Sequence, residues 1–214
     1  MLNIFARASV ARVTDPVGGW LVRAGLTPNA MTVIGTVASA LAAVLFIPRG
    51  GIWLFVGSAL VTVFVMFDLL DGAMARTAGK VTRYGSVLDA SCDRIADGVL
   101  FGCIAWWCFV VADDRITGIA ALICLAGAQI VSYIKARAEA AGLAADGGLV
   151  ERAERFIIAL VGTGIQGLGV PHAVDVAMWL LAVGVLITIG QRMTAVYRSA
   201  QAQEAKEAAG EDGP

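Results

Sequence analysis

The stretch AMTVIGTVASALAAVLFI at residues 30–47 contains no charged side chain, and neither does ITGIAALICLAGAQIVSYI at residues 116–134. Both stretches approach the length of about 20 apolar residues with which a helix crosses the hydrocarbon core of a bilayer. The composition agrees, because 58% of the 214 residues are hydrophobic and 15% are charged, whereas a soluble domain carries roughly 25% charged residues. These features exclude a water-soluble globule, a basic nucleic-acid-binding domain and a disordered protein.

The pattern of apolar residues along the whole chain predicts an all-α, polytopic membrane protein with six transmembrane helices. The six apolar segments lie at about 28–48, 52–76, 85–112, 116–139, 150–170 and 174–197. Ahead of them, charged and apolar residues are mixed on either side of Asp15 and Pro16, a pair that favours a helix start. We therefore expect an N-terminal amphipathic helix that lies in the membrane interface. Residues 1–198 are expected to form one membrane domain, and residues 199–214, which are rich in Ala, Gln and Glu, a disordered cytoplasmic tail.

The distribution of basic residues predicts the orientation of the chain. With a cytoplasmic N-terminus, fourteen of the 16 Lys and Arg residues fall on the cytoplasmic side, and Arg49 and Arg115 fall on the other. Positive charge accumulates on the cytoplasmic side of membrane proteins. We therefore expect a multi-pass protein of the cell (inner or plasma) membrane, with both termini and the functional site facing the cytoplasm.

Five carboxylates stand where the hydrocarbon core should be, or at its edge: Asp68, Asp71, Asp89, Asp93 and Asp97. Asp68 and Asp71 are three residues apart, and Asp89 and Asp93 are four residues apart, so each pair projects from one face of its own helix. Negative charges that converge in a low-dielectric region repel one another unless cations neutralise them. Because the ligands are oxygens without His or Cys partners, they favour Mg²⁺, with Mn²⁺ as the alternative. Two such ions about 3.5–4 Å apart suit displacement at phosphorus, although the same acids would also suit salt bridges between helices.

Eight residues at fixed spacing form one pattern across residues 68–93: Asp68, Asp71, Gly72, Ala75, Arg76, Gly85, Asp89 and Asp93. This pattern resembles the signature of the CDP-alcohol phosphotransferases, and six helices with an interfacial N-terminal helix and a cytoplasmic site are also similar to that family. The resemblance implies transfer from a CDP-linked lipid, two bound metal ions and a homodimer that forms through the membrane helices. It further implies that Asp68, Asp71 and Asp89 bind the metals. Asp93, near or also on a metal, is implied to be the general base.

The same resemblance implies a site for the cytidine nucleotide. Gly72, Ala75 and Arg76 are expected to hold the nucleotide and its diphosphate. The segment that begins at Thr27 is similar to the family's N-terminal nucleotide-contact region. The further candidate contacts are Asn29, Met31, Thr32 and Thr82. Thr32 and Thr82 would equally suit a helix start and a loop hydroxyl.

Basic side chains at the other cytoplasmic helix ends indicate the acceptor: Lys135, Arg137, Arg152, Arg155 and Arg192. Arg binds phosphate oxygens in a bidentate way, so as a group these residues favour an acceptor that carries its own phosphate. Singly, each would also suit a positive-inside residue or a contact with anionic lipid.

Two short stretches narrow the choice of acceptor. SYIKARAE at residues 132–139 and ERAER at residues 151–155 look most like the bacterial phosphatidylinositol-phosphate synthases within the family. That resemblance implies CDP-diacylglycerol and inositol phosphate as substrates, and phosphatidylinositol phosphate and CMP as products. Glycerol 3-phosphate, the acceptor of phosphatidylglycerophosphate synthase, is the alternative.

Other polar residues fall outside the signature. Asp97 lies one helical turn beyond Asp93 and is expected to be a structural partner of a nearby cation. His172, the one histidine, is expected in a loop on the opposite side of the membrane from the acids. Intramembrane acids also mark divalent-cation transporters, but a transport pathway needs polar groups that continue to the other face. There the neighbouring segments offer little beyond Asp113 and Asp114.

Overall fold

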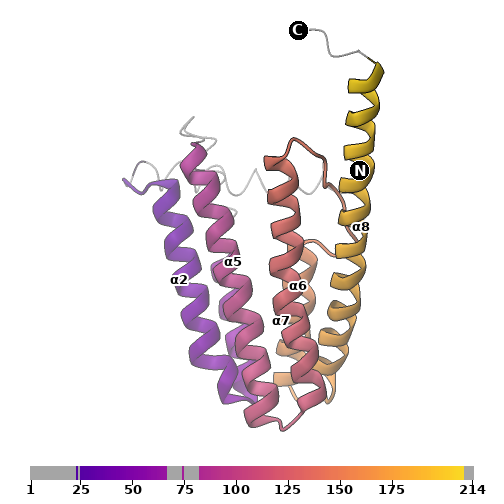
Figure 1. Ribbon diagram of the computed structural model, residues 1–214. Helices are drawn as coiled ribbons and strands as arrows, with labels where there is room; N and C mark the ends of the chain where they lie inside the picture. The colour runs from indigo at the N-terminus through magenta and orange to yellow at the C-terminus, as the bar shows by residue number, and fades with distance from the viewer. Residues whose placement is uncertain (1–22, 24, 67–73, 75–81, 210–214) are drawn as a thin grey trace, which may run out of the picture.

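The structure, a computed structural model, describes residues 23, 25–66, 74 and 82–209. All regular secondary structure in these residues is helical. The α-helices are α2 (Pro28–Phe46), α3 (Ile52–Val65), α5 (Arg83–Trp106), α6 (Arg115–Ala140), α7 (Arg152–Gly167) and α8 (Ala173–Ala209). A 3-10 turn, η1 (Ile47–Arg49), extends α2, and a π-helical turn, η2 (Trp107–Val111), extends α5. The helices stand side by side in an elongated bundle (Figure 1), which confirms the all-α prediction.

Four helical stretches of the described chain are long and apolar enough to cross a membrane: Pro28–Arg49, Arg83–Val111, Arg115–Ala140 and Ala173–Lys206. Helix α3 is apolar but shorter, and α7 has 16 residues. Each of the six predicted apolar segments overlaps one described α-helix, although α3 covers only Ile52–Val65 of the segment predicted at 52–76 and most of the remainder lies outside the described residues. The predicted interfacial helix lies in residues 1–22, which are outside the described residues.

Local sequence determines where the helices begin at the end of the bundle that carries the predicted site. The hydroxyl of Thr27 accepts a hydrogen bond from the backbone N–H of Ala30 at 3.2 Å, and Pro28 occupies the first turn of α2. At the start of α5, the hydroxyl of Thr82 accepts from the N–H of Gly85 at 3.0 Å. Such caps satisfy backbone donors that the first helical turn leaves unpaired.

The helices pack in a closed ring. Helix α2 packs on α3, α3 on α7, α7 on α8, α8 on α6, α6 on α5 and α5 on α2. Small residues permit close approach, since a Cβ at Gly127 of α6 would collide with Val185 of α8. Phe101 is fully buried between the helices, whereas large apolar side chains such as Leu41 and Leu180 are exposed on the outside. An outer surface of this kind suits contact with lipid.

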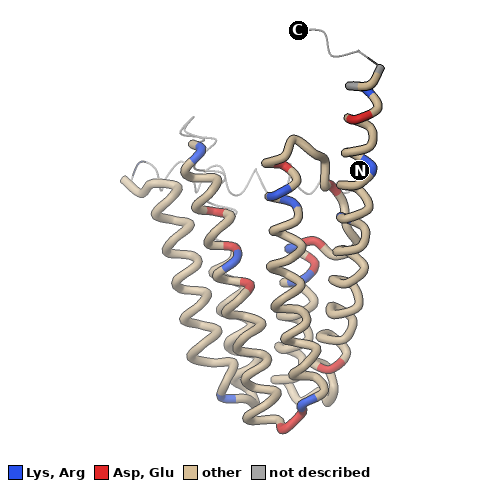
Figure 2. The backbone as a smooth tube through the Cα atoms, in the orientation of Figure 1, with Lys and Arg blue, Asp and Glu red and all other residues tan. Residues whose placement is uncertain are grey.

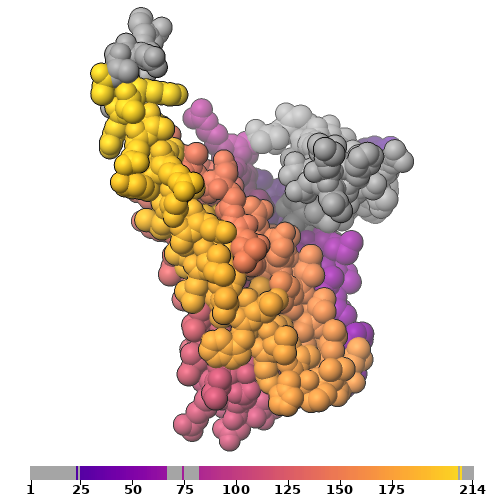
Figure 3. Space-filling model, turned by 90° about the vertical axis from the view of Figure 1, so that its right-hand side faces the viewer, coloured from indigo at the N-terminus to yellow at the C-terminus, as the bar shows by residue number. Residues whose placement is uncertain are grey.

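Helix α8 is longer than predicted. It continues through Ser199 to Ala209 and projects beyond the other helices (Figures 1 and 3). Ala, Gln, Glu and Lys, which dominate this stretch, have high helix propensity. The extension also contacts the α6–α7 loop, because Ser199 accepts from the N–H of Ala144 at 3.0 Å and Gln203 donates to the carbonyl of Gly142 at 2.8 Å. The first part of the tail that was predicted to be disordered is therefore helical.

Charged residues are distributed unevenly along the bundle. On α5 they gather over the half nearer to the end from which α8 projects (Figure 2). At the opposite end, Asp114 caps the start of α6, and His172, which directly precedes α8, has its Nδ1 2.6 Å from Oδ2 of Asp175. The acids of α5 and the histidine therefore lie toward opposite ends of the bundle, as predicted.

Candidate active site

Helix α5 carries two of the predicted metal-binding acids near its N-terminal end. Asp89 is exposed, and the side chain of Asp93, one turn further along, is 19% exposed. Five other predicted site residues lie outside the described residues: Asp68, Asp71, Gly72, Ala75 and Arg76.

The two predicted metal ligands in the described residues, Asp89 and Asp93, do not form a complete metal site by themselves. In the described part of the chain, no group of three or more His, Cys, Asp or Glu side chains comes close enough to hold one. The two carboxylates of α5 nevertheless supply hard oxygen ligands of the kind that Mg²⁺ and Mn²⁺ prefer. A complete site therefore needs further ligands, and Asp68 and Asp71 are the predicted ones.

Arg152, at the start of α7, joins the acids of α5. Its Nη2 lies 2.8 Å from Oδ1 of Asp93. Its Nε lies 3.7 Å from Oδ1 of Asp97, which is too far for a hydrogen bond. The guanidinium group also stacks 5.0 Å above the ring of Phe156, an arrangement that attracts a cation. The predicted base and a predicted phosphate ligand are therefore in direct contact.

Asp97 is fully buried and faces arginines from two helices. Its Oδ2 lies 3.1 Å from Nη1 of Arg94 and 3.2 Å from Nη2 of Arg155. Arg94 also donates to the carbonyl of Ala128 at 3.0 Å and to the hydroxyl of Ser132, both on α6. The prediction that Asp97 pairs with a nearby cation is confirmed. The sequence did not indicate that several arginines converge on it.

The remaining predicted phosphate ligands occupy different environments. Arg155 is 1% exposed and Arg192 is 6% exposed, whereas Arg137 is exposed and the side chain of Lys135 is 45% exposed. Arg192 donates to the carbonyl of Val131 at 2.7 Å, one helical turn before Lys135. Nε of Arg155 is buried and lacks a hydrogen-bond partner among the described residues.

The predicted nucleotide contacts from α2 and α5 lie close together. A Cβ at Gly85 would lie 3.0 Å from Oγ1 of Thr82 and 3.1 Å from Oδ1 of Asn29, so a residue without a Cβ suits this position. Thr82 caps α5, and the hydroxyl of Thr32 donates to a backbone carbonyl one turn back at 3.2 Å. Thr82 therefore has a helix-start role, whereas Thr32 lies inside α2, which begins at Thr27 and Pro28. Met31 and Thr32 are buried.

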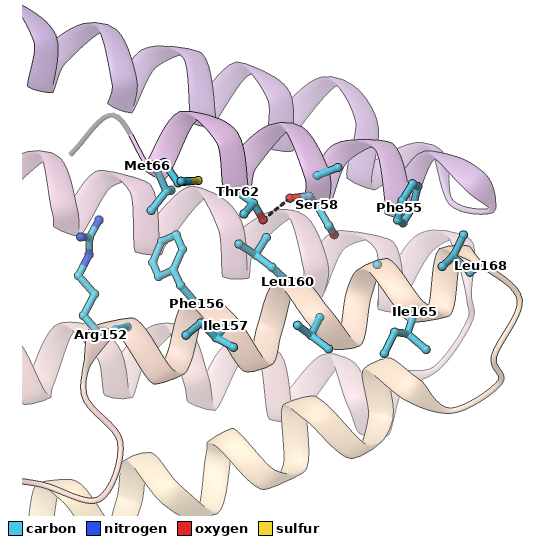
Figure 4. A pocket seen from close by; sticks show the side chains of 15 residues that line it. Phe55, Ser58, Thr62, Met66, Arg152, Phe156, Ile157, Leu160, Ile165 and Leu168 are labelled. Carbon is cyan, nitrogen blue, oxygen red and sulfur yellow. Dashed lines mark hydrogen bonds between the residues drawn. The ribbon is translucent and has the colours of Figure 1, made fainter. Parts of the chain in front are cut away.

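An apolar groove of about 750 Å³ runs between α3 and α7 (Figure 4). Phe55, Leu160 and Leu168 are among the residues that line it, and Met66 and Arg152 lie toward one end. Because Arg152 also contacts the acids of α5, this end of the groove adjoins the candidate active site.

The sequence analysis missed this groove. Small residues such as Ala59 of α3 and Gly164 of α7 line it. They are the only signal that could have found it, and small residues in apolar helices equally indicate close helix packing.

Comparison with known proteins identifies the family. The sequence-family model that describes the CDP-alcohol phosphatidyltransferases matches residues 25–190 of this chain. The chain is 53% identical over 197 residues to the phosphatidylinositol phosphate synthase of Mycobacterium marinum, which covers 91% of this chain and 83% of that protein. It is 50% identical over 201 residues to the phosphatidylinositol phosphate synthase of Mycobacterium tuberculosis, which covers 92% of each.

Solved structures show the same fold. The crystal structure of the Mycobacterium tuberculosis phosphatidylinositol phosphate synthase with CDP-DAG bound has a TM-score of 0.84 at 50% identity, over 88% of this chain and 95% of that chain. The structure of the same enzyme in complex with manganese and citrate has a TM-score of 0.83 at 50% identity, over 87% of this chain and 90% of that one. The chain therefore belongs to the CDP-alcohol phosphatidyltransferase family and is a membrane enzyme of phospholipid synthesis.

Proposed function

We propose that the chain transfers the phosphatidyl group of CDP-diacylglycerol to inositol phosphate, giving phosphatidylinositol phosphate and CMP. The names of relatives at 53% and 50% identity support this acceptor over glycerol 3-phosphate. The structural observation that carries the proposal is the ion pair between Asp93 and Arg152, because it sets the candidate base beside a side chain suited to phosphate. Family membership disfavours the transporter hypothesis.

The groove between α3 and α7 is our candidate site for an acyl chain of the donor. Its lining is almost entirely apolar, and Arg152 provides a charged group near one end. A lipid whose chain lies along Leu160 and Leu168 would bring its diphosphate toward Asp93. CDP-diacylglycerol would then enter sideways from the inner leaflet, with its acyl chains still among lipids.

The four acids are proposed to hold two Mg²⁺ ions, with Mn²⁺ as a substitute. Helix α3 ends beside the site, since Met66 lines the same groove as Arg152, and Asp68 follows Met66 by two residues. This supports the proposal that Asp68 and Asp71 approach Asp89 and Asp93. When bound, the ions would neutralise the diphosphate and the leaving CMP.

The cytidine nucleotide is proposed to bind at the same end of the bundle. Gly72, Ala75 and Arg76 would hold its diphosphate, and the helix starts of α2 and α5 would face the cytidine. The proposed contacts there are Asn29, Met31, Thr32 and Thr82. The short distance from Gly85 to both Asn29 and Thr82 supports a shared surface formed by the two helices.

Asp93 is proposed to remove the proton from the attacking hydroxyl of the acceptor. A general base needs hydrogen-bond reach to that proton, and the partial exposure of Asp93 leaves its carboxylate accessible. The phosphate of the acceptor would bind to the neighbouring cations: Lys135, Arg137, Arg152, Arg155 and Arg192. Buried Arg155 supports this role, because its Nε donates no hydrogen bond among the described residues and can donate one to a phosphate oxygen.

The membrane arrangement is proposed to follow the sequence analysis. All six apolar helices would cross or enter the bilayer, with residues 1–198 as one domain that includes an interfacial N-terminal helix. The basic residues would place the site on the cytoplasmic face of the cell membrane. A homodimer through the membrane helices is part of the proposal, and nucleic acid has no role in it.

The test is CMP release by the purified chain in lipid nanodiscs that contain CDP-diacylglycerol. Inositol phosphate, glycerol 3-phosphate and inositol are supplied in separate reactions with Mg²⁺. We expect rapid release of CMP and formation of phosphatidylinositol phosphate with inositol phosphate alone. Faster release with glycerol 3-phosphate would support the alternative acceptor, and no release with any acceptor would refute a transferase.

A further inference from the structure

Asp97 lies one turn beyond the last acid of the family signature and has no assigned role in the proposed reaction. We propose that Asp97 is a positioning residue that holds the guanidinium groups of Arg152 and Arg155 in place for the phosphate of the acceptor. This inference rests on the proposed function, and it explains how the cations of the acceptor site are kept in order.

The burial of Asp97 requires an explanation. Its side chain is fully buried, and a carboxylate is rarely buried unless charged groups or hydrogen bonds compensate it. Here Arg155, which is 1% exposed, approaches from α7, and Arg94 approaches from α5 itself. Helices α5 and α7 are not among the closely packed pairs of the ring, so this contact crosses its interior.

Among these arginines, Arg155 depends most on Asp97. Arg94 also donates to Ala128 and Ser132 of α6, and Arg152 also pairs with Asp93. The guanidinium of Arg155 donates a hydrogen bond to Asp97 at 3.2 Å. Without the carboxylate, neighbouring positive charges would repel Arg155 from its present position.

The carboxylate of Asp97 can also accept a hydrogen bond from Arg152. Its Oδ1 is buried without a hydrogen bond in the described residues, and Nε of Arg152 lies 3.7 Å from it. A shift of less than about 1 Å would bring these atoms to hydrogen-bond distance. Asp97 can therefore retain Arg152 when the substrate engages Asp93, and Arg152 and Arg155 then face the acceptor as a fixed pair.

The side chains around Asp97 carry an excess of positive charge, which suits an anionic ligand. Arg94, Arg152 and Arg155 face the two carboxylates of Asp93 and Asp97. A phosphate would offset the excess positive charge, and it would do so best where the guanidinium groups are already oriented. Asp97 acts through the arginines and does not itself touch the substrate.

The variant that tests this role is Asp97→Asn, which removes the charge and keeps the size. For the purified enzyme in nanodiscs we would measure kcat, the melting temperature and the KM of each substrate. We expect the KM for inositol phosphate to rise roughly tenfold and the KM for CDP-diacylglycerol to change by less than about twofold. Asp97→Glu, which restores the charge, should give an intermediate KM for inositol phosphate.

A double-variant cycle shows whether Asp97 acts through Arg155. In Asp97→Asn/Arg155→Gln, the rise in the KM for inositol phosphate should be smaller than the product of the two single-variant rises, because one of the two groups that Asp97 holds is already absent. Asp175→Asn, which alters an acid at the opposite end of the bundle, is the matched control and should leave both KM values unchanged.

Three outcomes would overturn the proposal: an unchanged KM for inositol phosphate in folded Asp97→Asn, an equal rise in both KM values, or fully additive effects in the double variant. If Asp97→Asn is not recovered folded, Asp97→Glu decides, and an equal rise in the KM values of both substrates in that variant contradicts the positioning role. The proposed function fails separately, if the wild-type chain forms no phosphatidylinositol phosphate at all.

Discussion

The guanidinium group of Arg152 lies 2.8 Å from the carboxylate of Asp93 across the interior of the helix ring. The two residues belong to α7 and α5, which are separated in the ring order by other helices. This contact links the acids proposed to bind metal with the cations proposed to bind the acceptor. It also lies at one end of the apolar groove that Arg152 helps to line.

Replacement of Asp93 by Asn should abolish CMP release while the chain stays folded. The amide cannot accept the proton of the attacking hydroxyl, and general-base catalysis contributes about 10²-fold or more to the rate. Turnover is measured with both substrates saturating, and the melting temperature checks the fold. Turnover at the wild-type rate would exclude Asp93 as the base. Asp175→Asn, far from the site, should keep full activity.

Replacement of Arg152 by Ala should raise the KM for inositol phosphate far more than that for CDP-diacylglycerol. A hydrogen bond to a charged group contributes about 1.5–3 kcal/mol, so we expect a rise of about tenfold or more. The same comparison applies to Arg155→Ala. Steady-state kinetics with each substrate varied in turn provides the measurement, and equal effects on both KM values would count against a phosphate pocket at these residues.

The fold was largely predictable because uncharged runs and helix starts both leave local signals. Asp114 and Thr82, for example, cap helices that begin within two residues of their predicted starts. The extension of α8 beyond Ser199 was not predicted, because a polar Ala-rich stretch is equally compatible with disorder until contacts such as that of Gln203 with Gly142 are known.

The candidate site was predictable only in part. Spacing along one helix places Asp93 and Asp97 on one face, but the choice of α7 as the source of their partners depends on the order of the helices in the ring. That order is set by packing of small and large side chains between distant segments, such as Gly127 against Val185, which periodicity does not reveal. For the same reason the groove was missed.

Filling the groove should weaken binding of the lipid donor. Gly164→Leu would project a side chain into the space between α3 and α7, where a Cβ at this position makes only ordinary contacts with Ser58 and Phe55. We expect the KM for CDP-diacylglycerol to rise several-fold while that for inositol phosphate stays unchanged. Gly190→Leu is the matched control, because a Cβ there meets open space on α8. If the two variants behave alike, the groove does not hold an acyl chain.

The cap of α6 should contribute to stability and not to catalysis. Asp114 accepts from the N–H of Thr117 at 3.0 Å, so Asp114→Ala should lower the free energy of unfolding by about 0.5–2 kcal/mol. This corresponds to a fall in melting temperature of about 2–4 °C per kcal/mol. Asp114→Asn, which keeps an acceptor oxygen, should lose less. An unchanged melting temperature in the Ala variant would contradict the role of the cap.

The same cap should make stability depend on pH. Hydrogen bonds from Thr117 hold the pKa of Asp114 below its usual value of 3.8. A lowered pKa in the folded chain stabilises it above the unfolded value and loses this effect as the pH falls through the folded one. The difference in melting temperature between the wild type and Asp114→Ala should therefore be constant above pH 3.8 and shrink below it. A difference in melting temperature that grows as the pH falls would contradict this prediction.

The central claim is that acids from two neighbouring segments share metal ions at the lipid diphosphate site, and counting bound Mn²⁺ tests it most directly. Titration of the purified chain, followed by the electron paramagnetic resonance signal of free Mn²⁺, should give two bound ions per chain. Asp68→Asn and Asp89→Asn should each lose at least one of them, and Asp175→Asn should lose none. Retention of both ions at wild-type affinity in either Asp68→Asn or Asp89→Asn would contradict a shared site.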